Sequence, residues 1–164
     1  MAYGQVVRWS VVVVNPYRIA VIVGSLRRDS WNRKLADALV QLALTNFELE
    51  QLRIGDLALY KQDDDANQAE SVKRLKREIE SAQGLLFVTG EYNGLIPGVL
   101  KNAIDHASRP YGRNAWAGEL AGVLGVCVSA IGTALAQQHL RNVLAYLNVP
   151  TMGQPEVFLQ AKNG

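Results

Sequence analysis

A short polar turn between Gly24 and Asn32 carries the side chains of this chain that are best suited to binding an anion. It follows an apolar segment, Ile19–Val23, and precedes a run with helical spacing, residues 32–44. The first amides of a helix have no partner within it and lie at the positive end of its dipole, so this position attracts negative groups. Further donors come from Ser25, Ser30 and Arg27. The turn predicts a site for a phosphate monoester.

The spacing of this turn excludes the two best-known nucleotide loops. The second and third glycines of G-x-G-x-x-G are missing, and no Gly-Lys-Ser/Thr follows as in a P-loop. Hydroxyl groups and an arginine in place of glycines favour a terminal phosphate surrounded by side chains. Serine and asparagine are also common helix caps, so the turn alone leaves a purely structural role open.

A second polar loop, residues 89–98, follows another apolar segment. It places Glu91, Tyr92 and Asn93 among glycines. Glycines let a backbone approach a ligand closely, and an amide side chain both donates and accepts hydrogen bonds. A tight turn before a helix that begins at a proline explains the same residues. Together, the two loops predict a ligand with a phosphate at one end and a heteroaromatic ring at the other.

Both loops must be positioned by the elements around them. Strands are expected at 19–23, 47–52, 85–89, 120–128 and 157–159, helices at 32–44, 72–79, 97–107 and 136–147, and loops at 54–66 and 109–118. This alternation predicts an α/β fold in which a parallel sheet carries helices on both faces. Ligands of such sheets bind at the carboxyl ends of the strands, which is where both polar loops fall. The loops after the segments 85–89 and 120–128 are therefore expected to complete the pocket.

Composition and charge narrow the class of protein. The chain has 164 residues, of which 49% are hydrophobic and 20% charged, and its net charge is +2. These values are typical of one globular domain. The basic residues are interleaved with acidic ones, so we expect no nucleic-acid partner. No segment reaches the roughly 18 apolar residues that a membrane helix needs, so we expect no membrane span.

The cysteine and the histidines give little support for other chemistry. A single cysteine, Cys127, precludes an intrachain disulfide and predicts a reducing, cytoplasmic location. It lies within an apolar run, so we expect a buried, inert thiol. His106 and His139 are expected at the surface or at an interface of helices, without metal-ligand spacing. We therefore predict no metal site.

The residues of both loops, and several beyond them, resemble a known family. The matching residues are Gly24–Arg27, Ser30–Asn32, Glu91–Gly94, Pro97–Asp105, Ala130–Ala134, Gln137–Arg141 and Gln154–Glu156. Over about residues 18–159 the chain is similar to the NADPH-dependent FMN reductases, and especially to their bacterial quinone and chromate reductase branch. Gly90 departs from this pattern, because the family usually has proline there, and its loop is expected to be looser.

The resemblance implies a role for nine residues. The positions that bind the FMN phosphate in the family are matched by Ser25, Arg27, Ser30 and Asn32, with Trp31 at the usual aromatic position beside them. The loop that borders the isoalloxazine ring is matched by Glu91, Tyr92, Asn93 and Gly94. No catalytic side chain is implied, because the flavin carries the redox chemistry.

The resemblance also implies a fold and an activity. The fold is a flavodoxin-like, doubly wound five-stranded parallel sheet of order 2-1-3-4-5. The activity passes hydride from NADPH or NADH through FMN to quinones or free flavin, with chromate or azo compounds as further acceptors. The implied assembly is a homodimer or homotetramer. An electron carrier that turns over no substrate, or a flavin-free paralogue with an interaction role, remains as an alternative.

The stretch of the chain that resembles the family also indicates the domain boundaries. We expect residues 1–17 to form an N-terminal extension, with an extra edge strand as the alternative, and residues 18–164 to form the FMN-binding domain. Five residues follow Leu159, which are too few for the last helix of a flavodoxin-like fold, so this helix is expected to be missing. An apolar face of the sheet would then be left uncovered.

Overall fold

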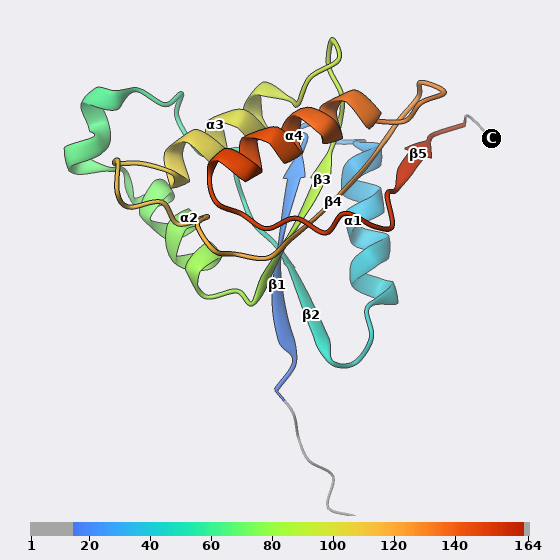
Figure 1. The fold of residues 1–164 in the computed structure, drawn as a ribbon, viewed down its shortest axis with the longest axis horizontal. Helices are drawn as coiled ribbons and strands as arrows, with labels where there is room; N and C mark the ends of the chain where they lie inside the picture. Colours follow the sequence, from blue (N-terminus) through green and yellow to red (C-terminus); the bar gives the residue numbers. More distant parts are fainter. Residues whose placement is uncertain (1–14, 163–164) are drawn as a thin grey trace, which may run out of the picture.

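A single parallel sheet organises the protein, whose structure, a computed structural model, describes residues 15–162 (Figure 1). The strands, in the spatial order β2-β1-β3-β4-β5, are β1 (Tyr17–Gly24), β2 (Phe47–Gln51), β3 (Gly84–Thr89), β4 (Ala121–Cys127) and β5 (Phe158–Gln160). The helices are α1 (Trp31–Leu42), η1 (Gln62–Asn67), α2 (Glu70–Glu80), α3 (Gly98–Ala107) and α4 (Ala134–Tyr146). The predicted flavodoxin-like fold and strand order are confirmed.

Each face of the sheet has its own hydrophobic core. On one face, Ile22 and Phe87 are fully buried beneath apolar residues of α2, α3 and α4. On the other face, Val21 and Val88 pack against α1, where Ala36 is fully buried. Because neighbouring residues of a strand point to opposite faces, strands covered on both sides are apolar throughout. This explains why β1 and β3 were the clearest strands in the sequence.

One predicted loop contains a further helix. The acidic run Asp63–Asp65 was expected within a loop, but it lies in the first turn of the 3-10 helix η1. Carboxylates are favoured there by the free amides of a helix start. The turn is also held by an ion pair of 3.3 Å between Lys61 and Asp64, and by a 3.3 Å hydrogen bond from the Tyr60 hydroxyl to Asp65.

The prediction for His106 was wrong, whereas His139 is exposed as expected. His106 lies on the inner face of α3 with 7% of its surface exposed, and its Nε2 atom is 2.9 Å from the carbonyl oxygen of Ala58. The ring of Tyr60 meets it edge to face, with centroids 5.3 Å apart. The long segment between β2 and η1 therefore covers a helix face that the sequence pattern placed at the surface.

An apolar groove lies at the amino-terminal ends of β1, β3 and β4. The groove has a volume of about 470 Å³, and its lining includes Ile19, Leu120, Gly122 and Met152. Within the described residues, β5 is the last element. The predicted N-terminal extension lies outside the described residues as far as residue 14, and Tyr17 already belongs to β1. Among the described helices, none is long and apolar enough to cross a membrane.

Candidate functional site

The carboxyl ends of three neighbouring strands, β1, β3 and β4, open onto one cavity of about 170 Å³. The residues that line it are Gly24, Ser25, Arg27, Ser30, Trp31, Asn32, Gly90, Glu91, Tyr92, Val126, Cys127 and Val128. The strand order reverses between β1 and β3, and parallel sheets bind ligands at such a point. The cavity therefore lies where the topology of the sheet predicts a ligand.

The turn after β1 brings hydrogen-bond donors to this cavity. Ser30 is the N-cap of α1, and its side chain accepts a 3.3 Å hydrogen bond from the amide of Arg33. Within residues 15–162, no acceptor is bound to the backbone amides of Trp31 and Asn32. The hydroxyls of Ser25 and Ser30 are buried, whereas Arg27 is exposed. Free amides, hydroxyls and a guanidinium together form a donor set for a phosphate.

Asn32 joins the start of α1 to the end of β4. Its Nδ2 donates to the carbonyl oxygen of Val126 at 2.9 Å, and its Oδ1 accepts from the amide of Val126 at 3.0 Å. The side chain is 6% exposed. Two buried hydrogen bonds between residues 94 positions apart fix the width of the cavity. The side chain keeps one N–H that these bonds do not use.

Next to the cavity, β3 and β4 approach each other closely. A Cβ atom at Gly125 would overlap the carbonyl oxygen of Thr89 and the hydroxyl of Thr133. Only glycine fits between these groups, so the two strands and the segment before α4 meet at this point. The loops after β3 and β4 are thereby held side by side.

The loop after β3 contains a tight turn between Tyr92 and Leu95. The amide of each residue donates to the carbonyl oxygen of the other, both at 3.0 Å. Asn93 and Gly94 between them have φ angles of 53° and 74°. These angles are typical of a type I′ turn, for which Asn-Gly is the favoured pair. The turn leaves the Tyr92 side chain 59% exposed beside the cavity.

The structure brings together seven of the nine predicted site residues. Ser25, Arg27, Ser30, Trp31, Asn32, Glu91 and Tyr92 line the cavity. Asn93 and Gly94 do not line it, because they form the turn beyond Tyr92. Their assignment to the cofactor, like that of the other seven, stays a prediction.

The end of β4 also lines the cavity, as its place at the carboxyl edge of the sheet predicts, although no site residue was assigned there from the sequence. Cys127 was expected to be a buried thiol, but it is half-buried and lies on the cavity wall. Its thiol donates a hydrogen bond to the carbonyl oxygen of Gly132. The position of Cys127 and Val128 at the carboxyl end of a central strand was the signal that could have identified them.

The residues at this cavity fit flavin mononucleotide. The donors at the start of α1 are suited to a phosphate, and the exposed rings of Trp31 and Tyr92 stand at the opening. Pockets that enclose a whole drug-sized ligand measure roughly 300–1,000 Å³, so a cavity of about 170 Å³ is too small to enclose the whole cofactor. The ring of such a ligand would lie across the opening, with one face accessible.

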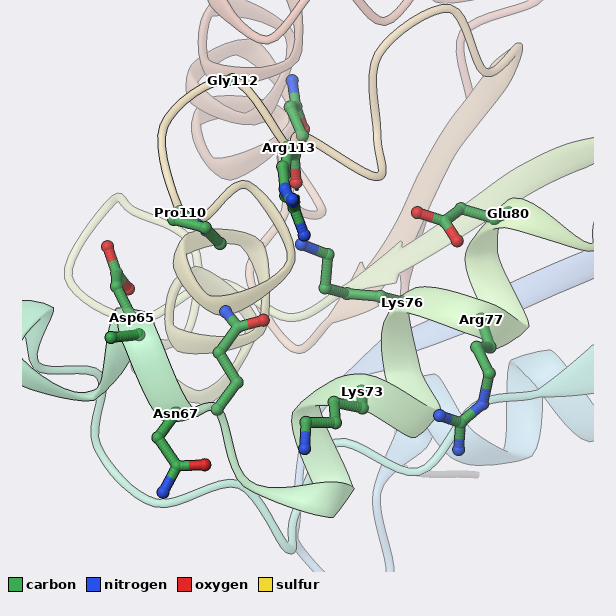
Figure 2. Close-up of a pocket in the computed structure, with 12 residues that line it drawn as sticks. Asp65, Asn67, Lys73, Lys76, Arg77, Glu80, Pro110, Gly112 and Arg113 are labelled. Atoms are coloured by element: carbon green, nitrogen blue, oxygen red, sulfur yellow. Dashed lines mark hydrogen bonds between the residues drawn. The ribbon is translucent and has the colours of Figure 1, made fainter.

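A larger cavity, of about 650 Å³, lies elsewhere in the molecule (Figure 2). Figure 2 shows Lys76 reaching from α2 towards the segment 109–114, where its ammonium group donates to the carbonyl oxygens of Arg109 and Arg113 at 2.7 and 2.8 Å. Burial lowers the pKa of Lys76. We favour the smaller cavity as the functional site, because it lies at the carboxyl ends of the strands where the strand order reverses.

Known proteins are similar to this chain over most of its length. The family model described as NADPH-dependent FMN reductase matches residues 17–164. A 2-hydroxy-1,4-benzoquinone reductase of a Burkholderia species is 52% identical over 143 residues, covering 87% of this chain and 78% of that protein. A quinone reductase of Pseudomonas putida is 47% identical over 144 residues, covering 87% of this chain and 77% of that protein.

A solved structure extends the similarity to three dimensions. The flavoenzyme NAD(P)H:(acceptor) oxidoreductase FerB from Paracoccus denitrificans superimposes with a TM-score of 0.86 at 46% identity. The match covers 90% of this chain and 81% of that chain. The family-model match and the identity to these relatives show that this chain belongs to the NADPH-dependent FMN reductase family.

Proposed function

We propose that this protein is an FMN-dependent NAD(P)H oxidoreductase that reduces quinones or free flavin. Chromate and azo compounds are further acceptors in this proposal. The observation that carries it is the set of phosphate donors at the start of α1, next to an opening flanked by Trp31 and Tyr92. The two quinone reductases described above, each at least 47% identical, support quinones as the acceptor class.

In this proposal, the residues of the protein bind the cofactor and orient it. Arg27, the Ser30 hydroxyl and the free amides of α1 hold the phosphate, while Tyr92 borders the ring. FMN, when bound, supplies a carrier that accepts hydride from a nicotinamide and passes electrons on singly or in pairs. Because the cavity ends at an open surface, the nicotinamide and the acceptor can use the same accessible ring face in turn. The arginines of the first loop favour NADPH over NADH.

The phosphate assignment is tested by comparing FMN with riboflavin, which lacks the phosphate. Replacing Arg27 with Ala removes a hydrogen bond to a charged group, which is worth about 1.5–3 kcal/mol, so the Kd for FMN should rise roughly 10- to 150-fold. The Kd for riboflavin should not change. Arg28→Ala is the matched control, because Arg28 is exposed nearby but does not line the cavity. Quenching of flavin fluorescence measures both constants. An R27A variant that binds FMN as tightly as the wild type refutes the assignment.

We further propose a homodimer or homotetramer in the cytoplasm. The exposed side of α4 carries apolar side chains, with Leu135 51% and Tyr146 84% exposed, which suits a contact between copies. A single cysteine and the lack of a membrane-spanning helix among the described residues are compatible with a reducing compartment. Light scattering coupled to gel filtration measures the mass in solution, and a monomer at micromolar concentration would contradict the assembly.

A further inference from the structure

Glu91 makes a contact that its predicted role beside the flavin ring did not include. One of its carboxylate oxygens accepts a 2.9 Å hydrogen bond from the backbone amide of Ala136. Ala136 is the third residue of α4, and Thr133, which precedes the helix, provides no side-chain cap. A carboxylate at this position satisfies an amide that has no partner within the helix, and it lies at the positive end of the dipole. Glu91 therefore caps a helix 45 residues away.

The rest of the loop also rests on α4. The carbonyl oxygen of Gly94 lies 3.2 Å from Nδ1 of His139. A Cβ atom at Gly94 would be in van der Waals contact with the side chain of Leu135, at 3.5 Å. The turn between Tyr92 and Leu95 is thus in contact with the first two turns of the helix, in addition to the bond made by Glu91.

The start of this loop is held by a 2.8 Å hydrogen bond from the Thr89 hydroxyl to the carbonyl oxygen of Gly90, but not by a side chain at Gly90 itself. Gly90 lacks a side chain, and a Cβ there would meet no atom closer than 3.4 Å. The proline that the family usually has at this position would fix the backbone, and glycine does not. The hydrogen bond of the next residue, Glu91, to the rigid end of a helix supplies a restraint in its place.

We propose that Glu91 is a positioning residue, whose carboxylate anchors residues 90–95 to the N-terminus of α4 and so sets where Tyr92 lies beside the flavin ring. This inference rests on the proposed function of the same cavity. It assigns to Glu91 an action through the loop rather than contact with the cofactor. The hydrogen bond, and not the negative charge, is the essential feature.

Two substitutions separate the hydrogen bond from the charge. Glu91→Gln keeps an oxygen that can accept from the Ala136 amide but carries no charge, whereas Glu91→Ala removes the acceptor. We expect E91Q to bind FMN within about threefold of the wild type, and E91A to bind it at least about tenfold more weakly, because the amide of the buried Ala136 is then left without its acceptor. Riboflavin binding should weaken equally in E91A, because the loop acts on the ring. This distinguishes E91A from R27A, which should affect FMN alone.

The cap itself is measured in the protein without flavin. Hydrogen exchange at the Ala136 amide should be at least about tenfold faster in E91A than in the wild type and little changed in E91Q. His139→Ala, which removes the second contact and leaves the cap, should weaken flavin binding less than E91A does.

Two results overturn the inference: E91A binding flavin as tightly as the wild type, or E91Q binding it as weakly as E91A. The second result would mean that the charge acts on the cofactor directly. A wild-type protein that binds no flavin would instead refute the proposed function. If the wild type binds no flavin, equal exchange rates of the Ala136 amide in the wild type and E91A would also refute the inference that Glu91 caps α4.

Discussion

Removal of the Asn32 side chain should open the cavity and destabilise the protein. In Asn32→Ala, both the amide and the carbonyl oxygen of Val126 lose the partners that they have at 3.0 and 2.9 Å. Both bonds are buried, and an unsatisfied buried backbone group costs about 1–3 kcal/mol. We therefore expect a loss of roughly 2–4 kcal/mol in the free energy of unfolding, because the two groups are adjacent and relax together.

Urea denaturation of the flavin-free protein measures this loss, and thermal melting provides a second value. For a domain of this size, each kcal/mol lowers the Tm by about 2–4 °C, so the melting temperature should fall by roughly 4–16 °C. Asn142→Ala is the matched control, since Asn142 is an exposed residue of α4 and its replacement should change the stability by less than about 0.5 kcal/mol. A loss below about 1 kcal/mol in N32A would refute the inference that this side chain holds β4 to α1.

Two further predictions concern packing and charge. Gly125→Ala should destabilise the fold by about 1–3 kcal/mol, because its Cβ would overlap the Thr89 carbonyl oxygen. Urea denaturation should show this loss, and an unchanged stability would contradict the close approach of β3 and β4. Burial, and then the nearby Glu80 carboxylate, raise the pKa of Glu119, so its ionised form is disfavoured in the folded state. The stability of the folded protein should therefore fall as the pH rises from the ordinary carboxyl pKa through this raised pKa. At pH 7, Glu119→Gln should be more stable than the wild type by up to about 0.5 kcal/mol. At a pH below the ordinary carboxyl pKa, the variant should have no advantage. An advantage of E119Q that grows as the pH falls would contradict this sign.

Local sequence rules predicted the central strands and the first loop. The apolar runs of β1 and β3 indicate strands that are buried on both faces of the sheet. Ser30 lies where the sequence predicts the N-cap of a helix. The Asn93–Gly94 pair likewise favours a tight turn, because both residue types adopt positive φ angles readily. In these cases the residues that decide the structure are neighbours in the sequence.

Contacts between distant segments could not be predicted in the same way. The side chain of Asn32 bonds to Val126, 94 residues away, and that of Glu91 bonds to Ala136. The family resemblance assigned both residues to the cofactor, an assignment that stays a prediction, but nothing in the sequence pointed to these distant partners. His106 was misplaced for the same reason, since the segment around Ala58 that covers it has no periodic pattern.

The redox reaction of the bound flavin tests the central claim most directly. The purified protein is incubated with FMN, freed of unbound flavin, and titrated with NADPH without air while its visible absorption is recorded. Our account predicts a retained flavin spectrum that NADPH bleaches and a simple benzoquinone restores. Retained flavin that NADPH cannot bleach would identify an electron carrier, and a protein that retains no flavin would contradict the cofactor site itself.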